Sequence, residues 1–303
     1  MLGVFVGDAA GAPIEFRAPS LTTADELVSA LSMGGGGVLD VGKGQITDDG
    51  ELTLALASTL ADGEFHVGWI EASYLSWFYS DPFDIGRTIR AALGGSHTRD
   101  LASQSNGALM RVAPLGIHCT HDTLAELVRK VTLECSITHP NRVAVDCNIL
   151  YCLAIGYLQR RQYGCIEYID DILASGAYDF DETVVSWYYD SLHFMSHNVH
   201  KQQGWVRHGF TLAFYFLRRG ASFYAAITTV LSLGGDTDTN AAIVGGLLGA
   251  YHGPNGIPRT MREPVLAFDC TTPDSGYTRP ARYSVKRFFD SGSPLAQQPQ
   301  RDE

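Results

Sequence analysis

Two short acidic stretches carry the residue types best suited to chemistry in this chain. One contains Asp236 and Asp238 with the hydroxyls of Thr237 and Thr239, directly after a pair of glycines. The run 241–251 that follows is almost wholly apolar and reads as a buried helix. Carboxylates against such a helix must be paired or bind a metal, because an isolated buried anion is strongly destabilised. We therefore expect a hard divalent cation at this position.

A second acidic stretch, formed by Thr47, Asp48 and Asp49, precedes a segment in which leucines recur every four residues from position 52 to position 60. This period predicts a helix, so both acidic stretches are expected where a loop meets a helix N-terminus. Together they offer four carboxylates and three hydroxyls, which suit one or two Mg²⁺ or Mn²⁺ ions rather than Zn²⁺. Either stretch alone also fits a simple helix cap, and only the pair favours a metal site.

Two segments each match part of a known motif but lack a residue that the motif requires. Residues 236–240 repeat the first three ligand positions of an EF-hand, but Ala241 and Leu247 occupy the positions of the required glycine and glutamate. Residues 37–44 nearly match GxxxxGK[ST], but Gly44 replaces the hydroxyl residue and no βαβ pattern surrounds it. Three histidines have zinc-compatible spacing, namely His193, His197 and His200. They lack an HExxH motif and a general base, so a packed or exposed helix explains them better.

A polar turn at residues 105–107 leads into an apolar segment. Asn106 and the neighbouring backbone N–H groups could bind the hydroxyls or phosphates of a ligand, and the same pattern also fits a plain turn before a helix. Pro140 indicates a helix boundary beside His139, a position at which a lone histidine is more often structural than functional.

The composition limits the classes of protein that this chain can be. Its 303 residues are 45% hydrophobic and no linker-like segment divides them, so we expect one domain over residues 1–290 and a polar tail over residues 291–303. The formal charge of −11 argues against a nucleic-acid scaffold or an anionic membrane surface. The six cysteines lack CxxC spacing, the N-terminus lacks a signal-peptide pattern, and no apolar run reaches transmembrane length. These features predict a cytoplasmic protein with reduced thiols.

Helical periodicity predominates and alternating strand patterns are scarce, so the predicted fold class is all-α. Amphipathic helices are expected at residues 66–79, 82–93, 122–137, 142–161 and 206–217. Asp122 is the expected N-cap of the third of these, and Ser222 is the expected N-cap of a helix that reaches Leu231. Residues 3–13 read as a buried first helix. After Pro258 we expect an irregular chain.

These stretches, in this order, resemble the ADP-ribosylglycohydrolase family, of the dinitrogenase reductase-activating glycohydrolase and ADP-ribosyl-acceptor hydrolase type. The resemblance covers residues 3 to about 257, and the matching segments are 7–15, 47–49, 105–111, 138–139 and 234–239. Its most specific part is the pairing of an upstream Thr-Asp-Asp with Gly-Gly-Asp-Thr-Asp-Thr. The family often continues Thr-Asp-Asp with threonine, whereas this chain continues with Gly50 and Glu51.

The resemblance implies a single, orthogonally packed, all-α domain with a binuclear Mg²⁺ or Mn²⁺ centre at the base of an ADP-ribose cleft. The implied metal ligands are Thr47, Asp48, Asp49, Asp236, Asp238 and Thr239. Glu15 would correspond to an acid that helps to activate water or gates the site, and either Glu15 or Asp49 would assist proton transfer. The residues implied to contact ADP-ribose are Ser105, Asn106, Gly107, Met110 and His139.

The implied activity is metal-dependent hydrolysis at ribose C1″, which releases ADP-ribose from a protein side chain, a nucleic acid or a small molecule. Two alternatives would use the same features. A non-catalytic ADP-ribose-binding or structural protein could keep the fold without the activity. A Mg²⁺-dependent nucleotide phosphohydrolase would use the same oxygen ligands. The acceptor linkage and the choice between Mg²⁺ and Mn²⁺ stay open.

Overall fold

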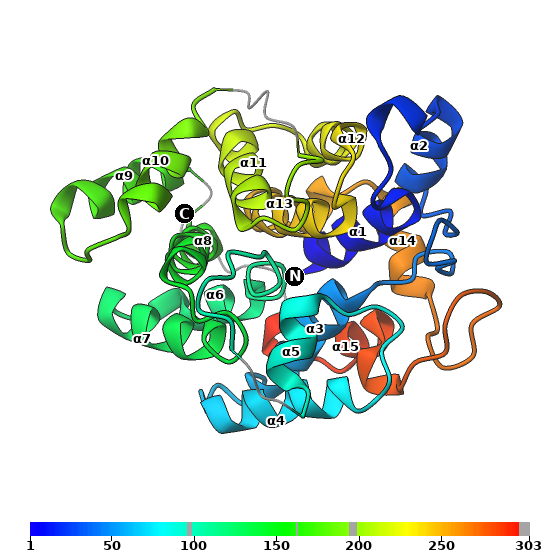
Figure 1. The fold of residues 1–303 in the computed structure, drawn as a ribbon, viewed down its shortest axis with the longest axis horizontal. Coiled ribbons are helices and arrows are strands. Elements are labelled where there is room, and N and C mark those ends of the chain that lie inside the picture. The colour runs from blue at the N-terminus through cyan, green and yellow to red at the C-terminus, as the bar shows by residue number, and fades with distance from the viewer. Residues whose placement is uncertain (96–98, 162, 194–198, 297–303) are drawn as a thin grey trace.

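The computed structural model describes residues 1–95, 99–161, 163–193 and 199–296. Within these residues the chain forms 15 α-helices, several short 3₁₀ turns and no β-strand, apart from two isolated bridges. The predicted all-α class is therefore confirmed (Figure 1). His197 and residues 297–303 of the expected tail lie outside the described residues.

The first half of the chain contains α1 (Leu2–Gly11), α2 (Ala24–Leu31), α3 (Asp48–Thr59), α4 (Val67–Phe78), α5 (Arg87–Leu93), α6 (Ala113–His118), α7 (Leu124–Cys135) and α8 (Arg142–Arg160). The second half contains α9 (Cys165–Ser175), α10 (Glu182–Asp190), α11 (Val206–Arg218), α12 (Phe223–Leu233), α13 (Thr237–His252), α14 (Arg259–Ala267) and α15 (Val285–Asp290). Ser222 caps α12 as predicted, because its hydroxyl accepts a hydrogen bond from the Ala225 N–H.

The central helix is α13, which packs against α1, α8, α11 and α12 (Figure 1). Nearly all of its side chains are buried, as the apolar run in the sequence predicted. A helix that is apolar on every side is stable only when other helices cover it all round. The acidic N-terminus of α13 is therefore fixed in the interior of the protein.

Three glycines at four-residue intervals bring the backbone of α1 against that of α13. A methyl group added at Gly3 would lie 2.0 Å from the Gly245 carbonyl oxygen, and one added at Gly7 would lie 2.0 Å from the Ala241 carbonyl oxygen. At Gly11 the added group would lie 2.3 Å from the Asp238 Cα. Residues four apart share one face of a helix, so these glycines form a continuous contact stripe. The stripe sets the distance between the ends of α1 and α13 that carry the acids described below.

Two expectations about helix boundaries were wrong. Residues after Pro258 are not irregular throughout, because α14 and α15 form there and pack against each other. The N-cap of α7 is Thr123 rather than Asp122, since the Thr123 hydroxyl accepts the Glu126 N–H at 3.3 Å. Asp122 instead lies 2.8 Å from the Lys130 ammonium group, and this ion pair uses the carboxylate.

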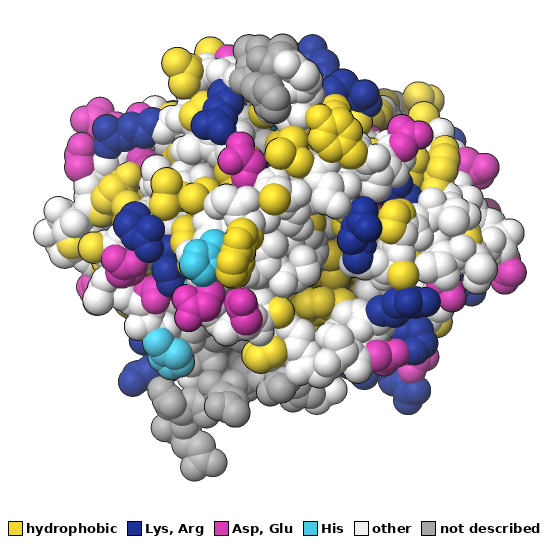
Figure 2. All heavy atoms as spheres, turned by 90° about the horizontal axis from the view of Figure 1, so that it is seen from below, with side chains coloured by type: hydrophobic (Ala, Val, Ile, Leu, Met, Phe, Trp, Pro, Cys, Tyr) yellow, Lys and Arg dark blue, Asp and Glu magenta, His cyan; other side chains and the backbone are white. Residues whose placement is uncertain are grey.

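The surface carries charges of both signs. On the face seen from below, acidic and basic side chains are interspersed rather than segregated (Figure 2). Within the described residues, no helix combines the length and apolar character that a membrane span requires. The acidic side chains that could take part in chemistry are instead buried, at the ends of α1, α3 and α13.

Candidate active site

The carboxylate of Asp8, on α1, fixes the N-terminus of α3. It accepts hydrogen bonds from the Thr47 N–H at 3.0 and 3.1 Å, the Thr47 hydroxyl at 2.9 Å and the Gly50 N–H at 2.9 Å. Asp8 therefore caps the N-terminus of α3, since the side chain of the N-cap residue Thr47 makes no capping hydrogen bond. Burial raises the pKa of Asp8 to about 7, although these hydrogen bonds act in the opposite direction. Local sequence patterns could not indicate this role, because Asp8 and Thr47 are 39 positions apart.

The two acidic stretches meet, as predicted. The Thr239 hydroxyl, at the start of α13, lies 3.3 Å from one carboxylate oxygen of Asp49 on α3. The other Asp49 oxygen is buried and has no hydrogen-bond partner in the described structure. Asp238 accepts the Thr239 N–H at 2.8 Å. Side chains far apart in the sequence thus converge around one buried, unsatisfied carboxylate oxygen.

Asp84 is an additional acid that the sequence patterns did not reveal. Residues 82–93 resemble one amphipathic helix, but α5 begins only at Arg87, after the N-cap Gly86. Asp84 therefore lies in the loop between α4 and α5, half-buried and hydrogen-bonded to Asp48. One carboxylate oxygen from each of Glu15, Asp84 and Asp238 lies within 4.8 Å of the other two. The sequence holds one local indication of this site, namely that Asp84 stands two residues before Gly86, the N-cap residue of α5.

These acids form one group, called the acidic cluster below, which consists of Glu15, Asp48, Asp49, Asp84, Asp236 and Asp238. Burial, followed by repulsion from Asp84 and other neighbouring acids, raises the pKa of Glu15 to about 9. Burial is also the largest cause that raises the pKa values of Asp48, Asp49 and Asp238 well above their usual range. Without a cation, Glu15 therefore holds its proton at neutral pH.

The acidic cluster suits divalent cations by three criteria. All its donors are oxygens, which Mg²⁺ and Mn²⁺ prefer. No described lysine or arginine forms an ion pair with any of its members. The unpartnered oxygen of Asp49 offers a buried ligand atom that nothing else in the described chain uses. The residues present therefore fit hard metal ions.

Asp236 connects the acidic cluster to the side of the cleft formed by Ser105, Asn106 and Gly107, called the polar wall below. It stands at the N-cap position of α13 after Gly234 and Gly235, whose φ angles of 67° and 80° favour glycine. One Asp236 oxygen accepts the Asn106 side-chain amide at 2.7 Å and the Gly204 N–H at 3.1 Å. The glycine pair also contacts the loop after α1, because the Gly235 carbonyl accepts the Phe16 N–H at 2.7 Å. The loop that carries Glu15 is therefore held beside Asp236.

His139 lies behind the polar wall and orients it. The Ser105 hydroxyl donates to the Thr88 hydroxyl at 3.0 Å, so its oxygen accepts from Nε2 of His139. Nδ1 of His139 then accepts from the Thr138 hydroxyl, 2.7 Å away, whose oxygen also accepts from the Arg111 guanidinium at 2.9 Å. His139 then carries its proton on Nε2 and donates it to the Ser105 hydroxyl at 2.9 Å. Burial, reinforced by Arg111, lowers the pKa of His139 to about 3. The imidazole is therefore neutral and serves as a fixed donor.

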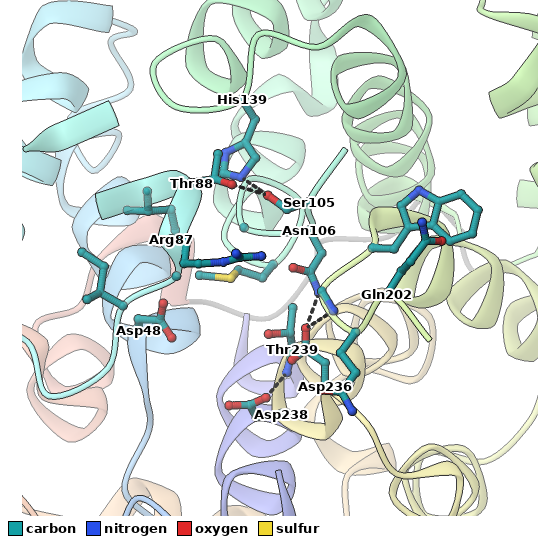
Figure 3. Close-up of a pocket in the computed structure, with 18 of the residues that line it drawn as sticks. Asp48, Arg87, Thr88, Ser105, Asn106, His139, Gln202, Asp236, Asp238 and Thr239 are labelled. Atoms are coloured by element: carbon teal, nitrogen blue, oxygen red, sulfur yellow. Dashed lines mark hydrogen bonds between the residues drawn. The ribbon is translucent and has the colours of Figure 1, made fainter. Parts of the chain in front are cut away.

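The acidic cluster and the polar wall enclose a cleft of about 840 Å³ (Figure 3). Among the residues that sequence reasoning placed in the site, all line the cleft except Thr47 and Asp49, which are buried. Sequence reasoning missed Asp84, Arg87, Thr88, Gln202 and Trp205, which also line it. The last two come from the loop before α11, whose sequence shows no catalytic or binding motif.

The fold and the cleft together define an α-helical enzyme with a site built from oxygen ligands. The chain belongs to the ADP-ribosylglycohydrolase family, whose model matches residues 1–282. This finding confirms the resemblance recognised from the sequence motifs.

Several named relatives match most of the chain. It is 30% identical over 271 residues to the ADP-ribosyl-[dinitrogen reductase] glycohydrolase of Rhodospirillum rubrum, covering 85% of each chain. It is 29% identical over 307 residues to a protein of Acanthamoeba polyphaga mimivirus named as an ADP-ribosyl glycohydrolase, covering 89% of this chain and 91% of that protein. It is 27% identical over 282 residues to the ADP-ribosylarginine hydrolase Tri1 of Pseudomonas putida (strain GB-1), covering 88% and 72%.

A solved structure shares the architecture. It is described as an ADP-ribosylglycohydrolase-related protein complex and superposes with a TM-score of 0.70 at 25% sequence identity. The match covers 87% of this chain and 93% of that chain. The helical arrangement in Figure 1 is therefore that of the family.

Proposed function

We propose that this protein releases ADP-ribose from an ADP-ribosylated acceptor by hydrolysing the bond at ribose C1″. The observation that carries the proposal is the acidic cluster, unpaired by any described lysine or arginine, at the base of a cleft of about 840 Å³. Clefts of this size are typical of sites that bind small molecules and cofactors. Family membership and the activities for which the Rhodospirillum and Pseudomonas relatives are named support the same reaction. We propose a cytoplasmic setting, where the six buried free thiols stay reduced.

We further propose that two Mg²⁺ or Mn²⁺ ions bind in the acidic cluster. Their ligands would be the side chains of Thr47, Asp48, Asp49, Asp236, Asp238 and Thr239. The buried, unpartnered oxygen of Asp49 supports this ligand set, and the position of Asp84 makes it a further candidate. When bound, such ions neutralise the carboxylates and polarise ribose or water oxygens as Lewis acids.

Glu15 is the side chain best placed to move a proton. It lines the cleft, and one of its oxygens lies within 4.8 Å of an oxygen of Asp84 and an oxygen of Asp238. Cleavage at C1″ passes through an oxocarbenium-like state, which carboxylates stabilise, and the attacking water needs a base. Asp49 is less suited to this task because it is buried and does not line the cleft. We therefore assign proton transfer to Glu15 and ion binding to Asp49.

The polar wall would hold the sugar and phosphate oxygens. Asn106 is oriented by Asp236, and Ser105 is oriented by the neutral His139. Groups that are already fixed lose little conformational entropy when a ligand binds, which favours affinity. Gly107 and Met110 also line the cleft, where Met110 adds apolar surface.

The test is a panel of arginine-linked, serine-linked, DNA-linked and O-acetyl ADP-ribose substrates, with ADP-ribose and phosphate products separated by chromatography. We expect ADP-ribose from at least one linkage class and no phosphate. Phosphate without ADP-ribose would identify a nucleotide phosphohydrolase instead. Binding of ADP-ribose without a product from any member would identify a non-catalytic binding protein.

A further inference from the structure

One cationic side chain stands in a cleft whose other described charged residues are all acidic. Among the described residues that line the cleft, Arg87 is the sole lysine or arginine, and the carboxylates of Glu15, Asp48, Asp84, Asp236 and Asp238 line the same space. Arg87 is the first residue of α5, and its side chain is exposed. Figure 3 shows the guanidinium reaching over the cleft, between Asp48 and the loop that carries Asn106.

Arg87 is unpaired within the described structure. Arg111 and Arg279, by contrast, are buried and form ion pairs with Glu134 and Glu51, each at 2.8 Å. The Arg87 side chain makes no hydrogen bond or ion pair with any described residue, although Asp84 is only three positions away. Its five N–H donors are therefore available to a ligand in the cleft.

The ligand of the proposed function has an anionic group that needs such a donor. ADP-ribose carries a diphosphate between its two riboses, and apart from Arg87 no lysine or arginine among the described residues lines the cleft to pair with that charge. A guanidinium group presents planar, paired N–H donors that match phosphate oxygens, which makes arginine better suited than lysine to this contact. The neighbouring loop at residues 105–107 adds hydroxyl, amide and backbone groups but no positive charge.

We propose that Arg87 binds the diphosphate of ADP-ribose and selects ligands that carry it, an inference that rests on the proposed function. Arg87 then acts as a specificity-determining residue. The diphosphate, held at one side of the cleft, orients the attached ribose towards the acidic cluster. Ligands without phosphate, such as adenosine, gain nothing from this contact.

The test is isothermal titration calorimetry of ADP-ribose and adenosine with the wild type, Arg87→Ala, Arg87→Lys and Arg90→Ala. Arg90 is a matched control because it is also an exposed arginine of α5 but does not line the cleft. Loss of charged hydrogen bonds to phosphate predicts that Arg87→Ala weakens ADP-ribose binding by about tenfold or more. Arg87→Lys should give an intermediate affinity, and Arg90→Ala should stay within about twofold of the wild type. Adenosine binding should be the same in all four proteins.

Two results would overturn the assignment while leaving the proposed function intact. One is equal ADP-ribose affinity for the wild type and Arg87→Ala. The other is an equal weakening of ADP-ribose and adenosine binding in Arg87→Ala, which would show that Arg87 does not act through the diphosphate. Failure of the wild type to bind ADP-ribose at all would overturn both proposals together.

Discussion

The C-terminal part of the chain braces the active site through one buried ion pair. Glu51, one turn after Asp48 on α3, is 2% exposed, and Arg279 is 5% exposed. Arg279 contacts the two Glu51 oxygens at 2.8 and 2.9 Å, and it donates to the carbonyl oxygens of Ser80 and Asp81 at 2.8 and 2.9 Å. The loop that begins at Asp81 carries Asp84. One guanidinium therefore joins the helix of the predicted metal ligands to the loop of the additional acid.

Replacing Arg279 with methionine removes all of these donors and keeps much of the side-chain volume. Glu51 would retain only the Trp77 indole N–H, at 2.7 Å, as a partner. Leaving one member of a buried ion pair without its partner costs about 3–5 kcal/mol. We therefore expect Arg279→Met to lower the free energy of unfolding by about 3–5 kcal/mol. Arg282→Met is the matched control, because Arg282 is exposed and acts on Glu51 only through its charge, and its effect, including its contact with the Tyr283 ring, should stay within about 1 kcal/mol.

Urea unfolding with linear extrapolation measures both variants. The penalty in Arg279→Met comes from an unpaired buried carboxylate, so adding Glu51→Gln should restore part of the lost stability. An Arg279→Met effect no larger than that of Arg282→Met would refute the bracing role. A double variant less stable than Arg279→Met alone would refute the proposed cause.

Three further predictions concern packing, acidity and the polar wall. Gly7→Ala should destabilise the fold by about 2 kcal/mol or more in urea unfolding, since the new methyl group meets the Ala241 carbonyl oxygen; a neutral effect would contradict the α1–α13 contact. Without divalent ions, stability should fall as pH rises from about 4 to about 9, because folded Asp8 and Glu15, with pKa values of about 7 and about 9, keep protons that the unfolded carboxyl groups lose near pH 4. The Asp8 part of this loss ends near pH 7, and the Glu15 part continues to about pH 9. Mn²⁺ should reduce this loss in thermal unfolding, and a flat profile without ions would contradict it. Burial keeps His139 neutral, with a pKa of about 3, so its NMR signals should not titrate between about pH 5 and pH 8; a midpoint near the usual histidine value would contradict this.

Local sequence patterns predicted the parts of the fold that depend on residues close together in the sequence. The apolar run after Asn240 could only be a covered helix, and α13 is that helix. The acids of the two motifs were expected at helix N-termini, and Thr47 and Asp236 are indeed the N-cap residues of α3 and α13. Their convergence followed from the shared need of buried carboxylates for a common partner. The catalytic and ligand roles of these residues stay predictions until they are measured.

Long-range contacts decided what local patterns missed. In the sequence, Asp8 is a single acidic residue within an apolar helix. Its capping role depends on hydrogen bonds to the N-terminus of α3, and the first of these partners, Thr47, is 39 positions away. Asp84 was hidden because residues 82–93 have helical periodicity although the helix occupies only their second part. Arg279 lies in a segment without periodicity, where a buried ion pair rather than an apolar stripe provides the contact. Contacts of this kind, between residues far apart in the sequence, produce no periodic pattern along the chain.

The measurement that tests the central claim most directly is ADP-ribose release from one accepted substrate by the wild type and by Asp238→Ala. Each protein is assayed with Mg²⁺, with Mn²⁺ and with a chelator, and circular dichroism checks that the variant is folded. We expect release by the wild type only when a divalent ion is present, and none by the folded variant. Undiminished release in the chelator, or full turnover by Asp238→Ala, would contradict the assignment of the acidic cluster as a catalytic metal centre.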